Sequence, residues 1–233
     1  MSRAGSIFGE ALKEGRKTLL EPEAKSICNE FGIPVTRFGV GRDLPEALTI
    51  AGAIGYPVAV KAVSPQVVHK SEVGAVLLNI LTPEELKVGW NRILANVAER
   101  ASGAKVVGIL VEEMAPPGIE VIVGGMKDKQ FGHVIMFGLG GIFVEVLKDV
   151  SFRAVPITTD DAKQMIEDVR GYPLLKGARG KTPVDIKALI EILLSVSRLL
   201  DKNPQVEELD LNPVIASATS ATVVDARLVV GGH

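Results

Sequence analysis

Three oxygen-bearing side chains near the end of the chain have types and spacing suited to binding a cation together. Asp210 and Asn212 are two positions apart, and Asp225 follows Asn212 by thirteen. Because side chains alternate between the two faces of an extended strand, Asp210 and Asn212 point to the same face. The run from 222 to 230 also has the composition of a strand, and the small residues from 216 to 221 can reverse the chain between the two. The sequence therefore predicts a hairpin that carries all three side chains.

Such a hairpin has the chemistry of a magnesium site. Two carboxylates and one amide oxygen would converge within reach of a single small, hard cation. Proteins hold Mg²⁺ on a nucleotide with few carboxylates, which leaves coordination positions for phosphate oxygens. The alternative interpretation is a solvated outer face of a sheet, because Asn-Pro also marks turns.

Lys61 is a second candidate, because it lies in the middle of the apolar run 58–63. A lysine in so apolar a strand is costly to bury unless an anion meets it. Phosphate is the natural anion, since the ammonium group is a compact point charge. A lysine that reaches solvent from the edge of a sheet is the alternative.

His69 lies in the polar segment 67–74, beside Lys70 and Ser71 and between two predicted strands. A histidine in this setting could touch phosphate, either as a donor or as a nucleophile. An exposed side chain without a role is the alternative.

Weaker signals surround these residues. Glu113 ends one predicted strand and Glu120 opens the next; a carboxylate suits ribose hydroxyls, and adenine needs backbone donors and acceptors. The glycine turn 138–141 resembles a phosphate loop, although it has neither P-loop nor Rossmann spacing. Arg153 is placed where it could reach a phosphate, and 174–180 is a second basic loop with glycines.

Composition limits the class of protein. The chain has 233 residues, of which 47% are apolar and 23% charged, so it is long enough for a substantial core. A net charge of −2 gives no electrostatic footprint for nucleic acid or for an anionic membrane. The single cysteine, Cys28, excludes an intramolecular disulfide and is expected to be buried. Neither a signal-peptide core nor a run long enough to span a bilayer is present, so a cytoplasmic protein is expected.

Hydrophobic periodicity and breaker residues predict alternating helices and strands. The hairpins among them indicate mixed rather than purely parallel sheets. Pro116-Pro117-Gly118 is a candidate boundary between two lobes. The expected helices cover 9–31, 45–54, 83–100, 160–170 and 184–201, and the expected strands cover 35–40, 58–63, 75–80, 106–114, 119–125, 134–137, 143–147, 150–156 and the terminal hairpin.

The order of these features resembles an ATP-grasp fold. More narrowly, essentially the whole chain resembles the β subunits of ADP-forming acetyl-CoA synthetases (acetate–CoA ligases), which are relatives of succinyl-CoA synthetase. The resemblance rests on Val60-Lys61-Ala62 and on the segments from His69 to Val76, Phe137 to Glu145, Leu174 to Gly180 and Leu209 to Pro213.

The resemblance implies an α/β (α+β) chain of two lobes, with mixed sheets and a nucleotide cleft between the lobes. The N-terminal lobe would cover 22–108 and the C-terminal lobe 109–233. Residues 1–21 would form a helix that packs on the C-terminal lobe or on a partner subunit.

The resemblance also implies roles for individual residues. ATP or ADP and Mg²⁺ would be the cofactors. His69 matches a position at which this family carries a histidine proposed to relay phosphate, whereas succinyl-CoA synthetase has no histidine there. The implied catalytic residues are His69, Lys61 and Arg153. The implied nucleotide-binding residues are Lys61 (α-phosphate side), Glu113 and Met114 (adenine), Glu120 (ribose), Gly74 and Asp210. The implied metal ligands are Asn212 and Asp225, with Asp210 beside them.

The implied reaction is acyl-CoA + ADP + phosphate ⇌ organic acid + ATP + CoA. The CoA-binding domains and the principal phosphohistidine belong to an α subunit in this family, so the chain would be catalytic only with that partner, in an α2β2 assembly. Neither nucleic acid nor a membrane is an expected partner. Two alternatives remain: a nucleotide-sensing ATP-grasp module, and another ATP-grasp ligase that forms an acyl phosphate and in which His69 is incidental.

Overall fold

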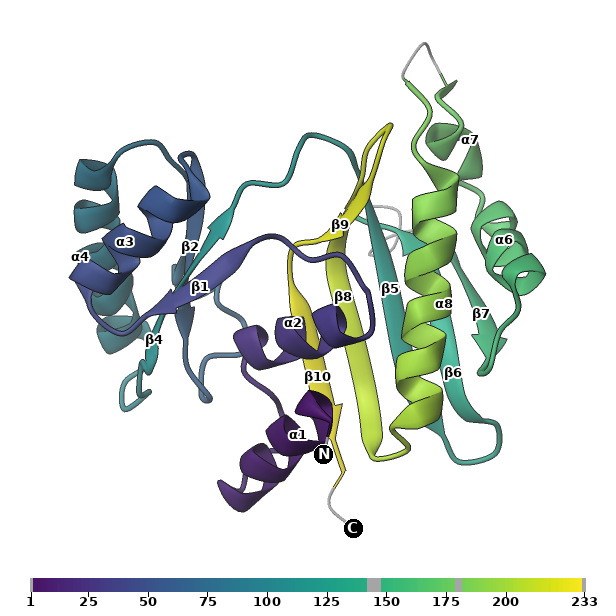
Figure 1. Cartoon of the computed structure of the whole chain (residues 1–233), viewed down its shortest axis with the longest axis horizontal. Coiled ribbons are helices and arrows are strands. Elements are labelled where there is room, and N and C mark those ends of the chain that lie inside the picture. Colours follow the sequence, from purple (N-terminus) through teal and green to yellow (C-terminus); the bar gives the residue numbers. More distant parts are fainter. Residues whose placement is uncertain (1, 142–147, 179–181, 232–233) are drawn as a thin grey trace. The chain divides into compact units, whose positions relative to one another are not determined.

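The computed structural model describes residues 2–141, 148–178 and 182–231. The chain divides into two compact units, each with its own hydrophobic core. The large unit comprises Met1–Val35 and Ala115–His233, and the small unit comprises Thr36–Met114 (Figure 1).

The small unit is a four-stranded antiparallel sheet with two helices on one face. Its strand order is β1-β4-β2-β3, so β2 and β4 are the interior strands. Val58 and Val60 of β2 and Val111 of β4 are fully buried in the core that the helices cover. The elements are β1 (Phe38–Gly41), α3 (Leu44–Ile54), β2 (Val58–Val63), β3 (Val76–Ile80), α4 (Pro83–Arg100) and β4 (Gly108–Glu113).

Local sequence signals explain where these helices begin. The Thr82 hydroxyl accepts a hydrogen bond from the Glu85 N–H at 3.1 Å, and Pro83 occupies the first turn of α4. The Asp43 carboxylate caps α3 in the same way through the Glu46 N–H at 2.8 Å. Side-chain caps of this kind satisfy backbone donors that have no partner within the helix. The predicted helix over 83–100 is confirmed to the residue.

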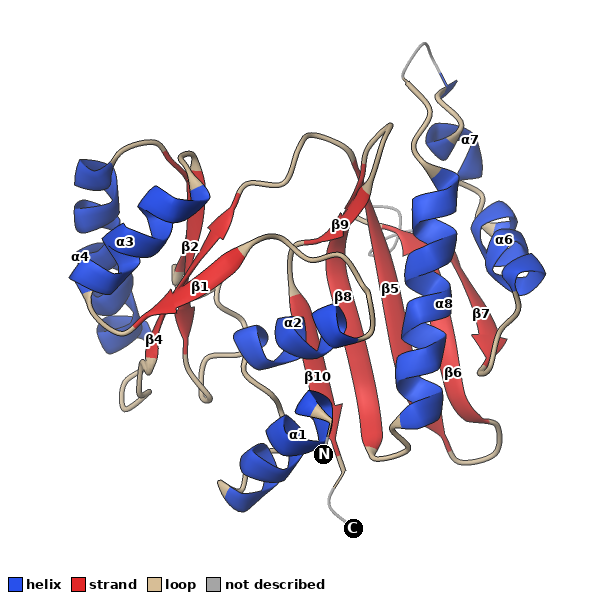
Figure 2. Cartoon of the chain, in the orientation of Figure 1, coloured by secondary structure: helices blue, strands red, loops and turns tan. Residues whose placement is uncertain are grey.

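The large unit is a six-stranded sheet with helices packed against one face (Figure 2). The strand order is β10-β8-β5-β6-β7, and β9 pairs with the end of β8. The covered face carries apolar residues from every second position, such as Val121 and Val123 of β5 and Leu209 and Leu211 of β8. The elements are α1 (Arg3–Lys13), α2 (Glu21–Glu30), β5 (Ile119–Asp128), β6 (Gly132–Leu139), β7 (Val150–Ala154), α6 (Thr159–Asp168), the short α7 (Tyr172–Leu175), α8 (Ile186–Lys202), β8 (Val206–Ala216), β9 (Ala221–Val223) and β10 (Ala226–Val230).

Every strand pair in these two sheets is antiparallel among the described residues, so the prediction of mixed sheets was wrong. The reason is the strand order of the small sheet. Helix α3 connects β1 to β2, but β4 lies between these two strands; α4 likewise connects β3 to β4, with β2 between them. Each crossover therefore joins strands of the same direction that are not hydrogen-bonded neighbours.

The division into units also differs from the expected ranges 22–108 and 109–233. Residues 22–35 lie in the large unit, because α2 buries Ala24, Ile27 and Cys28 in the core of that unit. Residues 109–114 lie in the small unit, because they form the interior strand β4. The side chains Ala4, Phe8 and Ala11 of α1 are buried in the large core as well.

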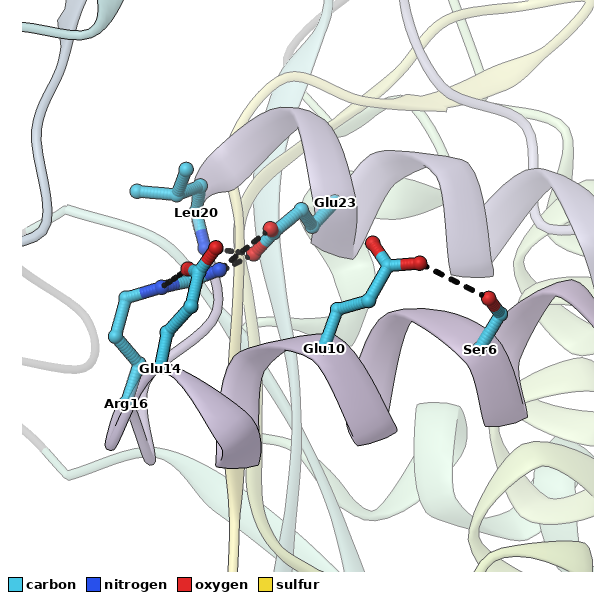
Figure 3. Close-up of polar contacts among 6 residues, drawn as sticks. All are labelled: Ser6, Glu10, Glu14, Arg16, Leu20 and Glu23. Carbon is cyan, nitrogen blue, oxygen red and sulfur yellow. Dashed lines mark hydrogen bonds and ion pairs between the residues drawn. The ribbon is translucent and has the colours of Figure 1, made fainter.

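The expected single helix over 9–31 is two helices joined by an extended segment. Within this segment, the Leu19 N–H donates to the Leu228 carbonyl at 2.9 Å, so the segment adds to the edge of the sheet beside β10. The Glu23 carboxylate accepts hydrogen bonds from Nη1 and Nη2 of Arg16, each at 2.8 Å, and from the Leu20 N–H at 2.7 Å (Figure 3). Chiefly through its hydrogen bonds to Glu23, the pKa of Arg16 is raised above its usual value.

No helix in the described ranges is both long and apolar enough to cross a membrane. The strand expected at 143–147 lies outside the described residues.

The Glu23 network provides a test of how α2 is anchored. We expect Glu23→Ala to lower the free energy of unfolding by about 1 to 2 kcal/mol, because it removes a helix cap and a bidentate ion pair. Glu10→Ala is the matched control, since the Glu10 carboxylate accepts only an exposed hydroxyl from Ser6, at 3.1 Å (Figure 3). Urea unfolding followed by circular dichroism measures both; equal losses would contradict the assigned role of Glu23.

Candidate functional site

The structure brings Asn212 and Asp225 side by side. The Asn212 N–H donates to the Asp225 carbonyl at 3.1 Å, and the Val224 N–H donates to the Pro213 carbonyl at 3.0 Å. The expected strand over 222–230 is interrupted at this point, and both β9 and β10 pair with β8. Asp225 therefore lies in a bend between two short strands, next to the polar edge of β8, and the predicted proximity of the two residues is confirmed.

Asp210 lies on the same strand as Asn212, opposite Arg227 of β10 and Gly124 of β5. Burial raises the pKa of the Asp210 carboxyl, the negative charges of Glu208 and Asp225 raise it further, and Arg227 opposes the change. A carboxylate that is destabilised by burial and by like charges is well suited to a cation.

Within the described part of the chain, no three His, Cys, Asp or Glu side chains converge as a closed metal cage. Mg²⁺ does not require such a cage, because it is usually bound through one or two carboxylates and keeps its other positions for water and phosphate oxygens. The backbones of Asn212 and Asp225 lie next to each other, and Asp210 is two positions before Asn212.

Asp210 shares its face of the large sheet with apolar side chains. The register places Gly124, Met136 and Phe152 in line with it, on the face opposite to the one that the helices cover. These residues line a cavity of about 280 Å³, and Phe152 is about half exposed.

Glu120 is exposed near the start of β5, two positions after Gly118. The Gly140 N–H donates to the Glu120 carbonyl at 2.8 Å, and a Cβ at Gly140 would lie 2.9 Å from the Glu120 Cβ. The glycine turn therefore packs against the backbone that carries Glu120. The rest of that motif, from Ile142 to Glu145, lies outside the described residues, as do Arg179 and Gly180 of the second basic loop.

The structure does not bring Arg153 to these residues, which corrects its assignment to the catalytic set. Arg153 pairs with Ile135 in the β6–β7 ladder, so it lies on the helix-covered face of the sheet, whereas Phe152 lies on the face of Asp210. Its guanidinium is 2.7 Å from the Asp168 carboxylate at the end of α6. The contact gives Arg153 a structural role between β7 and α6.

In the small unit, Lys61 lies on the interior strand β2, so the sheet-edge alternative is wrong. Lys61 is 4% exposed and its Nζ lies 2.7 Å from Oε1 of Glu112, which is fully buried. The Thr36 hydroxyl donates to Oε2 of the same carboxylate at 2.5 Å. An anion does meet the buried lysine, and it is a carboxylate of the protein.

Sequence reasoning missed Glu112 and Thr36. The signal for Glu112 was the one that identified Lys61, namely a charged residue within an apolar strand. The candidate carboxylate in the sequence was the adjacent Glu113, which ends β4. The Glu113 carboxylate accepts the Arg37 backbone N–H at 2.8 Å and its Nε–H at 2.6 Å, so Arg37 already binds it. Met114 follows as a half-buried residue.

His69 is exposed immediately before a tight turn in the small unit. The Ala75 N–H closes this turn onto the Lys70 carbonyl at 2.8 Å. Gly74 has a φ of +66°, and a Cβ there would lie 2.8 Å from Nδ2 of Asn96, so the turn requires glycine at this position. The turn fixes the chain beside His69 and leaves its imidazole accessible.

Comparisons with known proteins agree with this architecture. A family model described as an ATP-grasp domain matches residues 10–230. The chain is 48% identical over 229 residues to the β subunit of acetate–CoA ligase [ADP-forming] II from Pyrococcus furiosus, covering 97% of each chain. It is 47% identical over 230 residues to the β subunit of isoenzyme I from the same organism, covering 99% of each.

A longer relative and a solved structure extend the comparison. Acetate–CoA ligase [ADP-forming] I from Archaeoglobus fulgidus is 46% identical over 229 residues, which are 98% of this chain and 33% of that protein. A structure of the dinucleotide-forming acetyl-coenzyme A synthetase 1 from Ca. Korarchaeum cryptofilum, in complex with coenzyme A and Ca-AMPCP, superposes with a TM-score of 0.96 at 46% identity, over 98% of this chain and all of that one. The chain therefore belongs to the ATP-grasp family, and within it to the β subunits of ADP-forming acetate–CoA ligases.

Proposed function

We propose that this chain is the nucleotide-binding β subunit of an ADP-forming acyl-CoA synthetase, which interconverts acyl-CoA, ADP and phosphate with an organic acid, ATP and CoA. The observation that carries the proposal is the likeness, from end to end, to β subunits of that activity at 47% and 48% identity. The carboxylate, amide and ammonium groups of the candidate residues support it, because these are the kinds of group that bind Mg²⁺ and phosphates.

In the large unit, Asn212 and Asp225 would bind Mg²⁺, with Asp210 beside them. Their adjacency across the bend before β10 supports this assignment. Bound Mg²⁺ would neutralise phosphate oxygens as charge redistributes during transfer. Glu120 would accept hydrogen bonds from the ribose hydroxyls, since it is an exposed carboxylate at the start of β5.

In the small unit, Lys61 would donate to a nucleotide phosphate, and the turn at Gly74 would approach the nucleotide through its backbone. Because the Glu113 carboxylate already binds Arg37, adenine would be held through the backbone of Glu113 and Met114. Of the expected contacts from Glu113 and its flanking backbone, this proposal keeps those of the backbone.

His69 would carry the phosphoryl group within this chain. Imidazole forms a P–N bond as the donor's bond to phosphorus breaks, and it leaves readily once protonated when an ADP oxygen attacks that phosphorus. The exposure of His69 suits a group that must exchange phosphate with a partner.

The partner would be a CoA-binding α subunit that carries the principal phosphohistidine, with an α2β2 assembly expected. In the Archaeoglobus fulgidus relative, the matching region is one third of a longer chain, which supports the need for further domains. A cytoplasmic location stays a prediction.

Reconstitution tests the function and the role of His69 together. The chain mixed with a CoA-binding α subunit should form ATP from acetyl-CoA, ADP and phosphate. We expect His69→Ala to reduce this turnover at least about a hundredfold, because the phosphate carrier is lost, while the Kd for Mg-ADP stays within a few fold. His69→Gln is the matched control for side-chain size and should be equally inactive. Loss of nucleotide binding by a folded His69→Ala protein would favour a binding role instead.

The metal assignment is tested at Asp225. We expect Asp225→Asn to weaken Mg²⁺-dependent ADP binding about tenfold or more, because a neutral amide replaces a hard anionic ligand. Calorimetry with Mg²⁺, and again with EDTA, separates the metal-dependent part of binding. Asp201→Asn, an exposed position on α8, controls for the change in net charge. Unchanged binding by Asp225→Asn would remove Asp225 from the metal site.

The raised pKa of Asp210 predicts a pH dependence in the absence of Mg²⁺. A carboxyl whose folded pKa is above its unfolded value stabilises the fold below the unfolded pKa, and that contribution is lost as the pH rises through the folded pKa. Asp210→Asn should therefore be more stable than the natural protein at pH 7, and this advantage should shrink at pH 3.5. Urea unfolding at both pH values measures it, with Asp201→Asn as control. An advantage that does not depend on pH would contradict the assignment.

A further inference from the structure

We infer that Glu112, held by Thr36, positions the ammonium group of Lys61 for the nucleotide phosphates. Glu112 acts through Lys61 and is not itself a ligand of the nucleotide in this proposal. The inference rests on the proposed function and deepens it, because it explains how the phosphate-binding cation is fixed in place.

The register of the small sheet places the two charged residues together. Glu112 lies opposite Ala59 and Lys61 lies opposite Leu110, so Glu112 and Lys61 are diagonal neighbours on one face of the β2–β4 pair. The distance from Nζ to Oε1 is 2.7 Å. Both β2 and β4 are interior strands, so each is hydrogen-bonded to a neighbouring strand on both sides. The backbones that carry Lys61 and Glu112 are therefore held in place.

Thr36 orients the carboxylate. Its hydroxyl donates to Oε2, while Oε1 faces Lys61, so the two oxygens of Glu112 have different partners. Rotation of the carboxylate would break both contacts. Thr36 and Glu112 are fully buried, and their hydrogen bond is therefore shielded from competing water.

A lysine side chain depends more than an arginine side chain on a neighbouring group that fixes the position of its charge. Its ammonium is a point charge at the end of a flexible stem, and it gains direction only from its neighbours. An ammonium carries three donors, so the ion pair with Glu112 is compatible with donation to a phosphate oxygen. The carboxylate also compensates the buried positive charge before a nucleotide binds.

Calorimetry with two ligands tests the inference. We expect Glu112→Gln to raise the Kd for Mg-ADP about tenfold, because Lys61 loses its ion-pair partner. The Kd for adenosine, which has no phosphate, should stay within about twofold. If the role of Glu112 were purely structural, Glu112→Gln would raise the Kd for Mg-ADP and the Kd for adenosine alike. Glu99→Gln, at an exposed carboxylate on α4, is the matched control and should change neither.

A double-mutant cycle shows whether Glu112 acts through Lys61. Lys61→Met should weaken Mg-ADP binding, and adding Glu112→Gln to it should weaken binding no further. The double variant should also unfold at a higher temperature than Lys61→Met, since it no longer buries a carboxylate without its cation. Additive losses of affinity would overturn the proposal.

Thr36 provides milder variants that preserve the charges. Thr36→Val removes the hydroxyl at nearly constant shape and should weaken Mg-ADP binding, whereas Thr36→Ser restores a hydroxyl and should recover it. Equal Kd values of the natural protein and Thr36→Val for Mg-ADP, with weaker binding by Lys61→Met alone, would show that the positioning role is wrong. The proposed function would stand in that case. If the natural protein does not bind Mg-ADP, the proposed function fails as well.

Discussion

The large unit depends on the alternation of side chains across a sheet of which the helices cover only one face. Leu209 and Leu211 point into the core, so Asp210 and Asn212 must point to the other side. A shift of one residue in β8 would reverse both sets and bury two polar side chains. The strand β8 pairs with β5, β9 and β10. This one strand therefore fixes the positions of Asp210, of the bend at Asp225 and of the cavity beside Phe152 relative to one another. The placement of the proposed metal ligands thus follows from core packing.

Alternation also explains what the sequence predicted well and where it failed. Most elements follow from periodicity and from capping residues, as in the helix that Thr82 begins. The position of Arg153 could not be predicted from its own strand, because β7 has an inverted pattern in which Ser151 is buried and Phe152 is exposed. Hydrophobicity alone assigns the wrong face to such a strand. The split of 222–230 into β9 and β10 likewise depends on pairing with β8, which no local signal encodes.

The small unit shows a different limit. Burial of a lysine within an apolar strand implies that an anion lies near it, and the sequence predicted that much. The identity of the anion depends on which strand becomes the neighbour of β2. Glu112 is fifty-one positions from Lys61, and only the order β1-β4-β2-β3 brings the two together. For a contact between distant segments, the sequence shows that a buried charge needs a partner but does not show which residue the partner is.

The large unit is assembled from both ends of the chain, whereas the small unit is one continuous segment. During synthesis, residues 36–114 can complete their sheet as soon as β4 has left the ribosome. Helices α1 and α2 must wait with exposed apolar faces until β10, the last strand, is made. Their contact closes a loop of nearly the whole chain, which is entropically expensive and slow. The small unit is therefore a folding unit inserted within another, and α1 and α2 can complete their packing only after β10 has been made.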